Sequence, residues 1–349
     1  MSSTAASERV PVVTLTGHLG AGKTTLLNHL LQQPGARVGV VVNDFGTVNV
    51  DAGLVTGQID EPESIAGGCL CCLEDAGGLD DALEKLTHPR LGLDVVIVEA
   101  SGIADPVTLS RMIRFSGVER VRPGGVVDVV DALEYFGTVD RGGDPPARYS
   151  VTSLVVVNKT DRLPAEDGAR TLARIEARVH ERNPAAQVVR TSHGRVDPAL
   201  VYDAASAEDP PDQLPLAALL RDGREHDHQH ADAVTVTASG PVGPGLLVDL
   251  LEDPPPGAYR IKGRVVVDTG RSLRGYVVNV VGRSVHVTGR RVAGAAGGVG
   301  DGGFGELVAI GMHLDVGHVR ERLERALAPA ERPDARGFAR LQRYRRLSD

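Results

Sequence analysis

Residues 10–33 of this 349-residue chain, VPVVTLTGHLGAGKTTLLNHLLQQ, decide its fold. Residues 10–16 form a β-branched run that predicts a buried strand, and residues 23–33 have the leucine spacing of a helix. Between these segments, glycines lead into Lys23 and Thr24 in the pattern of a phosphate-binding loop. Because a strand precedes the loop and a helix follows it, the sequence predicts a P-loop nucleotide-binding domain.

The loop offers three kinds of group to a nucleotide triphosphate. Its glycines allow backbone N–H groups to converge on the phosphates, Lys23 reaches the β- and γ-phosphate oxygens, and Thr24 offers its hydroxyl to Mg²⁺. The residues expected to contact the nucleotide here are Gly20, Ala21, Gly22, Lys23, Thr24 and Thr25.

Apolar runs after the loop predict an alternation of strands and helices. Strands are expected at residues 38–42, 94–98, 126–130, 154–157 and 187–189, with helices at residues 79–86, 107–115 and 167–182. Such alternation is typical of a mostly parallel sheet. Residues 1–205 are therefore predicted to form an α/β domain.

The composition changes after residue 205. Residues 206–232 are polar, acidic and proline-containing, which predicts a linker. Residues 331–349 are Arg-rich, and we expect them to form a mobile tail. Between linker and tail, residues 233–330 are predicted to form a smaller α+β domain, with strands at 234–238, 259–267, 275–281, 284–288 and 307–310 and helices at 245–251 and 316–327.

A guanine-reading element follows the expected strand at residues 154–157. Asn158, Lys159, Thr160 and Asp161 match the N-K-x-D pattern of P-loop GTPases. The Asp161 carboxylate can accept hydrogen bonds from guanine N1–H and the exocyclic amine together, and adenine has no such pair of donors. The sequence therefore favours GTP over ATP.

Two acidic residues are expected near the Mg²⁺ ion. Glu99 follows the strand at residues 94–98, where a P-loop enzyme orients Mg²⁺ or its water, and Gly102 is placed to sense the γ-phosphate through its N–H. Asp44, after the second strand, is expected to approach the ion from a switch segment. An ordinary acid at a strand end is the alternative interpretation of Glu99.

All three cysteines of the chain, Cys69, Cys71 and Cys72, lie in one C-x-C-C motif between polar and glycine residues. Thiolates are ligands that Zn²⁺ prefers, so we expect a metal site in a loop. A fourth ligand is left open between water, Glu63, a histidine and a target protein. Reduced, buried cysteine without metal is the alternative. Reduced thiols also indicate the cytoplasm.

Three histidines alternate inside the expected linker. His226, His228 and His230 are interpreted as auxiliary metal ligands. The alternative is a solvated linker without a specific role.

Charge and composition argue against nucleic-acid and membrane partners. The net charge is −8, aromatic residues make up 3% of the chain, and there is no Trp, which disfavours a base-stacking surface. No apolar run approaches the roughly 20 residues that a membrane-spanning helix needs.

Five motifs in one order resemble the CobW-type metallochaperone GTPases, relatives of the nickel-insertion GTPases UreG and HypB. They are the P-loop, N-D-F-G, G-G-C-x-C-C, E-x-S-G-x-x-D-P and N-K-x-D, and residues 259–263 and 307–311 are similar to the C-terminal domain of that family. One segment departs from it: residues 149–153 read YSVTS, where family members usually have a Gln and an Ala-Asp pair. That departure concerns a local contact or partner surface rather than the nucleotide site.

The resemblance implies slow, Mg²⁺-dependent hydrolysis of GTP to GDP, with Zn²⁺ or Co²⁺ held by the cysteines and delivered to a client protein. We expect nucleotide state to set the geometry of the cysteine loop through Thr24, Asp44 and Glu99. One alternative is a module that senses GTP and metal and regulates another protein without transferring metal. Another is a GTP-driven insertion factor for an enzyme or corrinoid. A homodimer that depends on nucleotide or metal is left open.

Overall fold

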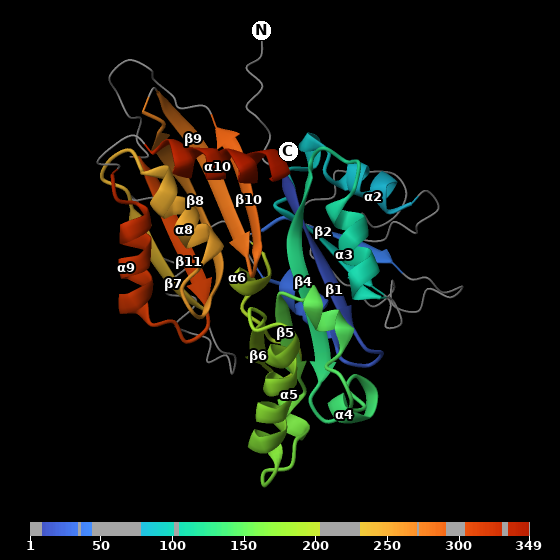
Figure 1. Cartoon of the computed structure of the whole chain (residues 1–349). Helices are drawn as coiled ribbons and strands as arrows, with labels where there is room; N and C mark the ends of the chain where they lie inside the picture. Colours follow the sequence, from blue (N-terminus) through green and yellow to red (C-terminus); the bar gives the residue numbers. More distant parts are fainter. Residues whose placement is uncertain are drawn as a thin grey trace, which may run out of the picture. The chain divides into compact units, whose positions relative to one another are not determined.

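The computed structural model describes residues 9–33, 36–43, 78–100, 105–202, 231–270, 272–290, 304–329 and 334–348 (Figure 1). They divide into two compact units, an N-terminal unit up to residue 202 and a C-terminal unit from residue 231. Within these ranges, no helix is long and apolar enough to cross a membrane. The expected linker lies almost wholly outside the described residues.

The N-terminal unit alternates strands with helices and short 3-10 turns. In chain order they are β1 (Val10–Gly17), α1 (Lys23–Leu31), β2 (Val38–Asn43), α2 (Leu79–Leu86), η2 (Pro89–Leu91), β3 (Val95–Ala100), α3 (Pro106–Arg114), β4 (Val121–Asp131), α4 (Tyr135–Thr138), η3 (Ala147–Ser150), β5 (Leu154–Asn158), η4 (Thr160–Arg162), α5 (Gly168–Arg182), β6 (Gln187–Arg190) and α6 (Pro198–Val201).

The strands of this unit form one parallel sheet in the order β2-β3-β1-β4-β5-β6. β3 and β5 are buried at every position, which is typical of a sheet covered on both faces. The prediction of a mostly parallel α/β domain is confirmed. Since all the strands run the same way, their carboxyl ends meet at one edge.

Helices α2 and α3 cover one part of the sheet and α5 another. Leu83 of α2 and Ile113 of α3 pack in one apolar cluster with Val98 of β3, whereas Ile175 and Val179 of α5 pack in another with strands β4 and β5. The D-P pair of the E-x-S-G-x-x-D-P motif starts α3: the carboxylate of Asp105 accepts from the N–H groups of Val107 (3.2 Å) and Thr108 (3.1 Å).

Two strands of this unit differ most in extent from the prediction. β3 continues to Ala100, so Glu99 lies inside the strand rather than after it. β4 begins at Val121, five residues before its expected start, and includes Pro123 and two glycines. The pairing of β1 with β4 shifts register between Val12 and Val13, opposite this stretch. Pro and Gly gave no strand signal in the sequence because they disfavour regular strands.

The C-terminal unit is built on an antiparallel sheet. Its elements are β7 (Asp232–Thr237), α8 (Pro244–Glu252), β8 (Ala258–Asp268), β9 (Leu273–Val281), β10 (Ser284–Arg290), β11 (Gly305–Gly311), α9 (Val316–Ala326) and α10 (Ala335–Ser348). The strand order is β10-β9-β8-β11-β7. Side chains from one face of this sheet form a single core with all three helices, which confirms an α+β unit.

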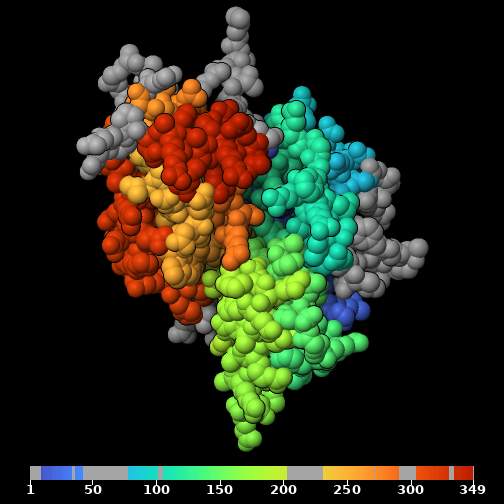
Figure 2. All heavy atoms as spheres, in the orientation of Figure 1, coloured from blue at the N-terminus to red at the C-terminus, as the bar shows by residue number. Residues whose placement is uncertain are grey.

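The expected mobile tail is instead helix α10, which packs on α8 and β10 (Figures 1 and 2). Leu341 is fully buried in the core, and Phe338 and Tyr344 pack against it. Arg340 pairs with Asp249 (2.7 Å) and Glu252 (2.5 Å) of α8. The prediction was wrong because it weighed the arginines alone and missed the apolar spacing of 338, 341 and 344, the mark of an amphipathic helix.

Leu341→Ala is expected to destabilise the protein by about 2–5 kcal/mol, because it removes buried methyl groups and leaves a cavity. Leu347→Ala is the matched control on the same helix, since Leu347 is 74% exposed and an exposed substitution changes stability by less than about 0.5 kcal/mol. The measurement is urea unfolding followed by circular dichroism. Equal effects of the two substitutions would contradict the burial of α10.

Candidate nucleotide site

The phosphate-binding loop joins β1 to α1 through glycines that no other residue can replace. Gly17 has φ +151°, and a Cβ there would lie 2.4 Å from the carbonyl oxygen of Val129. Gly22, the residue before α1, has φ +106°, and a Cβ there would lie 2.3 Å from Nδ2 of Asn158. Both the backbone conformation and the lack of space therefore require glycine. The loop directs the N-terminus of α1 toward the edge where the strands end, an arrangement suited to phosphate.

Lys23 and Thr24 lie in the first turn of α1, where Lys23 contacts Gly17 and Thr24 contacts Glu99. Lys23 is 7% exposed, and its ammonium donates to the carbonyl oxygen of Gly17 (3.1 Å). The hydroxyl of Thr24 donates to Oε1 of Glu99 (3.2 Å), so the acid on β3 faces the loop. Glu99 is 3% exposed. A hydroxyl and a carboxylate are oxygen ligands that suit Mg²⁺, so this pair fits the ion that the sequence predicts.

Asn158 joins the guanine-reading element to the phosphate-binding loop. Its Nδ2 donates to the carbonyl oxygen of Ala21 (2.9 Å), and its Oδ1 accepts from the N–H of Gly194 (3.0 Å). The side chain is buried. Asn158 therefore holds three segments together: the loop after β1, the end of β5 and the turn after β6.

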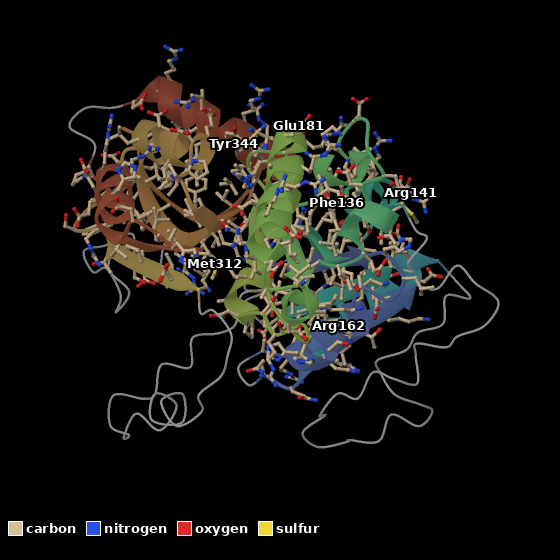
Figure 3. All side chains as sticks on the ribbon, turned by 90° about the horizontal axis from the view of Figure 1, so that it is seen from below. Phe136, Arg141, Arg162, Glu181, Met312 and Tyr344 are labelled. Carbon is tan, nitrogen blue, oxygen red and sulfur yellow. The ribbon has the colours of Figure 1, made fainter. Side chains whose placement is uncertain are left out.

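Lys159 and Asp161 lie in the turn that follows β5: Lys159 directly precedes η4, and Asp161 is within it. Lys159 has φ +60°, an uncommon conformation for a residue with a side chain, and its ammonium pairs with Asp131 at the end of β4 (2.6 Å). Asp161 lies in η4, exposed to solvent, and its N–H donates to Oγ of Ser192 (3.3 Å). Arg162, the last residue of η4, is labelled in Figure 3. The carboxylate of Asp161 is thus at the surface, where a base can reach it.

Sequence reasoning missed the turn after β6. Thr160 Oγ1 lies 3.1 Å from the carbonyl oxygen of Thr191 and 3.1 Å from Oγ of Ser192, and Gly194 contacts Asn158. Residues 191–194 therefore position both ends of the guanine-reading element. The one available signal was their place after the last parallel strand, at the edge where ligands bind in such sheets.

The remaining site predictions lie outside the described residues. They concern Asp44, Gly102 and the suggested fourth ligand Glu63, the cysteines Cys69, Cys71 and Cys72, and the histidines His226, His228 and His230. In the part of the chain that the structure describes, no group of three or more His, Cys, Asp or Glu side chains is arranged to hold a metal ion.

The site thus combines a strand that ends in a phosphate-binding loop, a buried Asn158 that bridges to the loop and an acid that faces Thr24. Residues 11–190 match the CobW/HypB/UreG nucleotide-binding domain. The chain belongs to this family. Residues 231–327 also match the C-terminal domain of the cobalamin synthesis protein CobW, so both units of this CobW-family chain are accounted for.

Curated relatives match this chain over different lengths. The chain is 33% identical over 203 residues to the zinc chaperone YjiA of Escherichia coli, covering 56% of this chain and 61% of YjiA. It is 26% identical over 353 aligned positions to the zinc chaperone CobW of a Sinorhizobium species, covering 89% of this chain and 96% of that protein. Among solved structures, Zn(II)-bound YjiA GTPase from E. coli matches 91% of this chain and 99% of that one, at 21% identity and a TM-score of 0.42.

Membership of this family confirms the expectation of a P-loop GTP hydrolase at the level of the family. The zinc-chaperone names of the relatives agree with the expected class of metal-handling GTPases.

Proposed function

We propose that this CobW-family chain hydrolyses GTP and uses its nucleotide state to hold Zn²⁺ and pass it to a client protein. The observation that carries the proposal is the contact of Asn158 with Ala21, since it makes the guanine-reading element and the phosphate-binding loop one site. Support for the metal comes from the zinc-chaperone names of two relatives and from the C-x-C-C motif of this chain.

Each described residue has a distinct part in hydrolysis. The Lys23 ammonium exchanges the carbonyl of Gly17 for β- and γ-phosphate oxygens and stabilises the charge that develops there. Thr24 and Glu99 supply the oxygen ligands, direct or through water, for Mg²⁺, which neutralises phosphate charge when bound. Asp161 accepts from the guanine base. From the switch segments, Gly102 is proposed to contact the γ-phosphate through its N–H, and Asp44 is proposed to approach the Mg²⁺ ion.

The cysteines are proposed as the tight metal site. Three thiolates suit Zn²⁺ and leave its fourth coordination position open. A metal ion that is passed to another protein needs such an open position. Co²⁺ is a weaker candidate by the order of affinities for such ligands. Histidines 226, 228 and 230 are proposed as auxiliary ligands.

Changing Cys69, Cys71 and Cys72 together to Ser is expected to remove tight, roughly stoichiometric Zn²⁺ binding, because serine hydroxyls are far poorer zinc ligands than thiolates. The matched control changes His226, His228 and His230 to Ala and should keep the tight site. Both are titrated against a competing chelator with GTP analogue and with GDP. A serine variant that keeps tight Zn²⁺ while the alanine variant loses it would place the site on the histidines.

Transfer of the metal separates the proposal from its alternative. Zinc-loaded protein is mixed with an apo acceptor peptide of higher zinc affinity, and release is compared before and after a single GTP turnover. Release that follows turnover supports delivery to a client, whereas metal retained throughout supports a GTP- and metal-sensing regulatory module. Native mass spectrometry of the same samples reports whether the chain forms a homodimer in either nucleotide state.

A further inference from the structure

A charged residue is buried in the middle of the parallel sheet, next to the phosphate-binding loop. Asp128 lies on β4 between β1 and β5, and its side chain has no exposed surface. Its neighbours on the adjacent strands are Thr16 and Val155. A central strand of a covered parallel sheet is normally apolar throughout, so a carboxylate here is costly and calls for a function.

Two groups hold the Asp128 carboxylate in place. The hydroxyl of Thr16 donates to Oδ1 of Asp128 (2.7 Å), and Nε of Arg148 lies 3.3 Å from its Oδ2 as an ion pair. Burial raises the pKa of Asp128 above its usual value and outweighs the charge of Arg148, the hydrogen bond from Thr16 and the charge of Lys23, all of which lower it.

Thr16 transmits this contact to the loop. It is the residue directly before Gly17, whose carbonyl oxygen accepts from Lys23 and whose backbone lies against Val129 of β4. β1 and β4 lie side by side (Figure 1), so the Thr16–Asp128 bond fixes the last residues of β1 on β4. The orientation of the turn at Gly17 then depends on a hydrogen bond one residue away.

Arg148 extends the contact toward the guanine-reading element. It lies in η3, directly before residues 149–153, which depart from the family pattern. Its carbonyl oxygen accepts from the hydroxyl of Thr152 (2.9 Å), and the hydroxyl of Ser153 exchanges hydrogen bonds with the backbone of Val126 (2.9 and 3.0 Å). These contacts set the start of β5, the strand that ends at Asn158.

We propose that Asp128, paired with Arg148, is a positioning residue for GTP hydrolysis that orients the turn at Gly17, and with it Lys23, through the hydroxyl of Thr16. Asp128 makes no direct contact with a bound nucleotide in this proposal, because its side chain is wholly buried within the sheet. The inference rests on the proposed hydrolysis of GTP. It assigns a role to residues that the phosphate-binding and guanine-reading motifs do not include.

A second buried pair in the same unit provides the control. Asp140 is 4% exposed and pairs with Arg178 of α5 (2.6 Å). Phe136 and Glu181, labelled in Figure 3, come from the α4 and α5 elements beside it. No hydrogen bond described for Asp140 leads to the phosphate-binding loop. Asp140→Asn therefore breaks a similar Asp–Arg pair without disturbing the turn at Gly17.

The test compares steady-state GTP turnover of the full chain carrying Asp128→Asn, Thr16→Val or Asp140→Asn. Thr16→Val keeps the shape and removes only the hydroxyl, and it serves as the second variant if Asp128→Asn does not fold. We expect kcat to fall about tenfold or more in Thr16→Val, with a smaller rise in KM. In Asp128→Asn we expect a smaller fall, because the amide oxygen still accepts from Thr16. Asp140→Asn should lower the melting temperature and leave kcat within twofold.

Unchanged kcat in Thr16→Val, or an equal fall in Asp140→Asn, would overturn the inference. A different result would contradict the proposed function, namely a wild-type chain that does not hydrolyse GTP. In that case the equilibrium Kd for a fluorescent GTP analogue is the readout. A weaker Kd in Thr16→Val than in Asp140→Asn then supports the positioning role, and equal values reject it.

Discussion

Lys23→Ala is expected to reduce GTP hydrolysis by at least about 100- to 1000-fold, the effect of removing one preorganised donor from a transition-state charge. The ammonium of Lys23 donates to the Gly17 carbonyl oxygen (3.1 Å), and we propose it as the cation that the first turn of α1 offers to phosphate. The fold should persist by circular dichroism, because the loss is of charge rather than of packing. Steady-state release of phosphate at saturating GTP measures the effect.

The control for this prediction is Lys85→Ala. Lys85 is exposed on α2, so the same substitution changes the net charge equally without touching the loop. Its turnover should equal that of the wild type. Undiminished turnover of Lys23→Ala would remove the phosphate-binding loop from the mechanism.

Asp161→Asn is expected to reverse the base preference of the site. The amide of Asn would donate to the C2 carbonyl of xanthine and accept from its N1–H, whereas guanine would meet a donor opposite its own amine. Sites built on such hydrogen bonds discriminate by up to about 10⁴-fold. Turnover or binding with GTP, XTP and ATP measures the change, and XTP should become the better substrate.

Asp167→Asn is the matched control, since Asp167 is exposed just before α5 and its side chain caps nothing there. It should keep the preference for GTP. Equal turnover of ATP and GTP by the wild type would contradict the guanine assignment, as would an Asp161→Asn variant that still prefers GTP to XTP.

Three features that the sequence analysis missed depend on contacts between residues far apart in the chain. Arg340 and Leu341 looked like part of a charged tail, yet the acids that pair with Arg340 lie on α8, about 90 positions earlier in the chain. Asp128 and Arg148 gave no signal, because neither belongs to a motif and the hydroxyl that joins them to the loop comes from Thr16 on another strand. Residues 191–194 likewise contact Asn158 across the sheet edge.

The sequence by itself determined those features of the protein that depend only on residues adjacent in the chain. Strand, glycine loop and helix at residues 10–33, the guanine-reading element after β5 and the alternation of strands and helices follow from local periodicity and backbone sterics. Strand order was decided only by the tertiary structure: β4 lies between β1 and β5, which brings Asp128 to Thr16 and Asn158 to Ala21. Such contacts depend on which elements pack together, a balance of burial and polar satisfaction over the whole unit that no short segment contains.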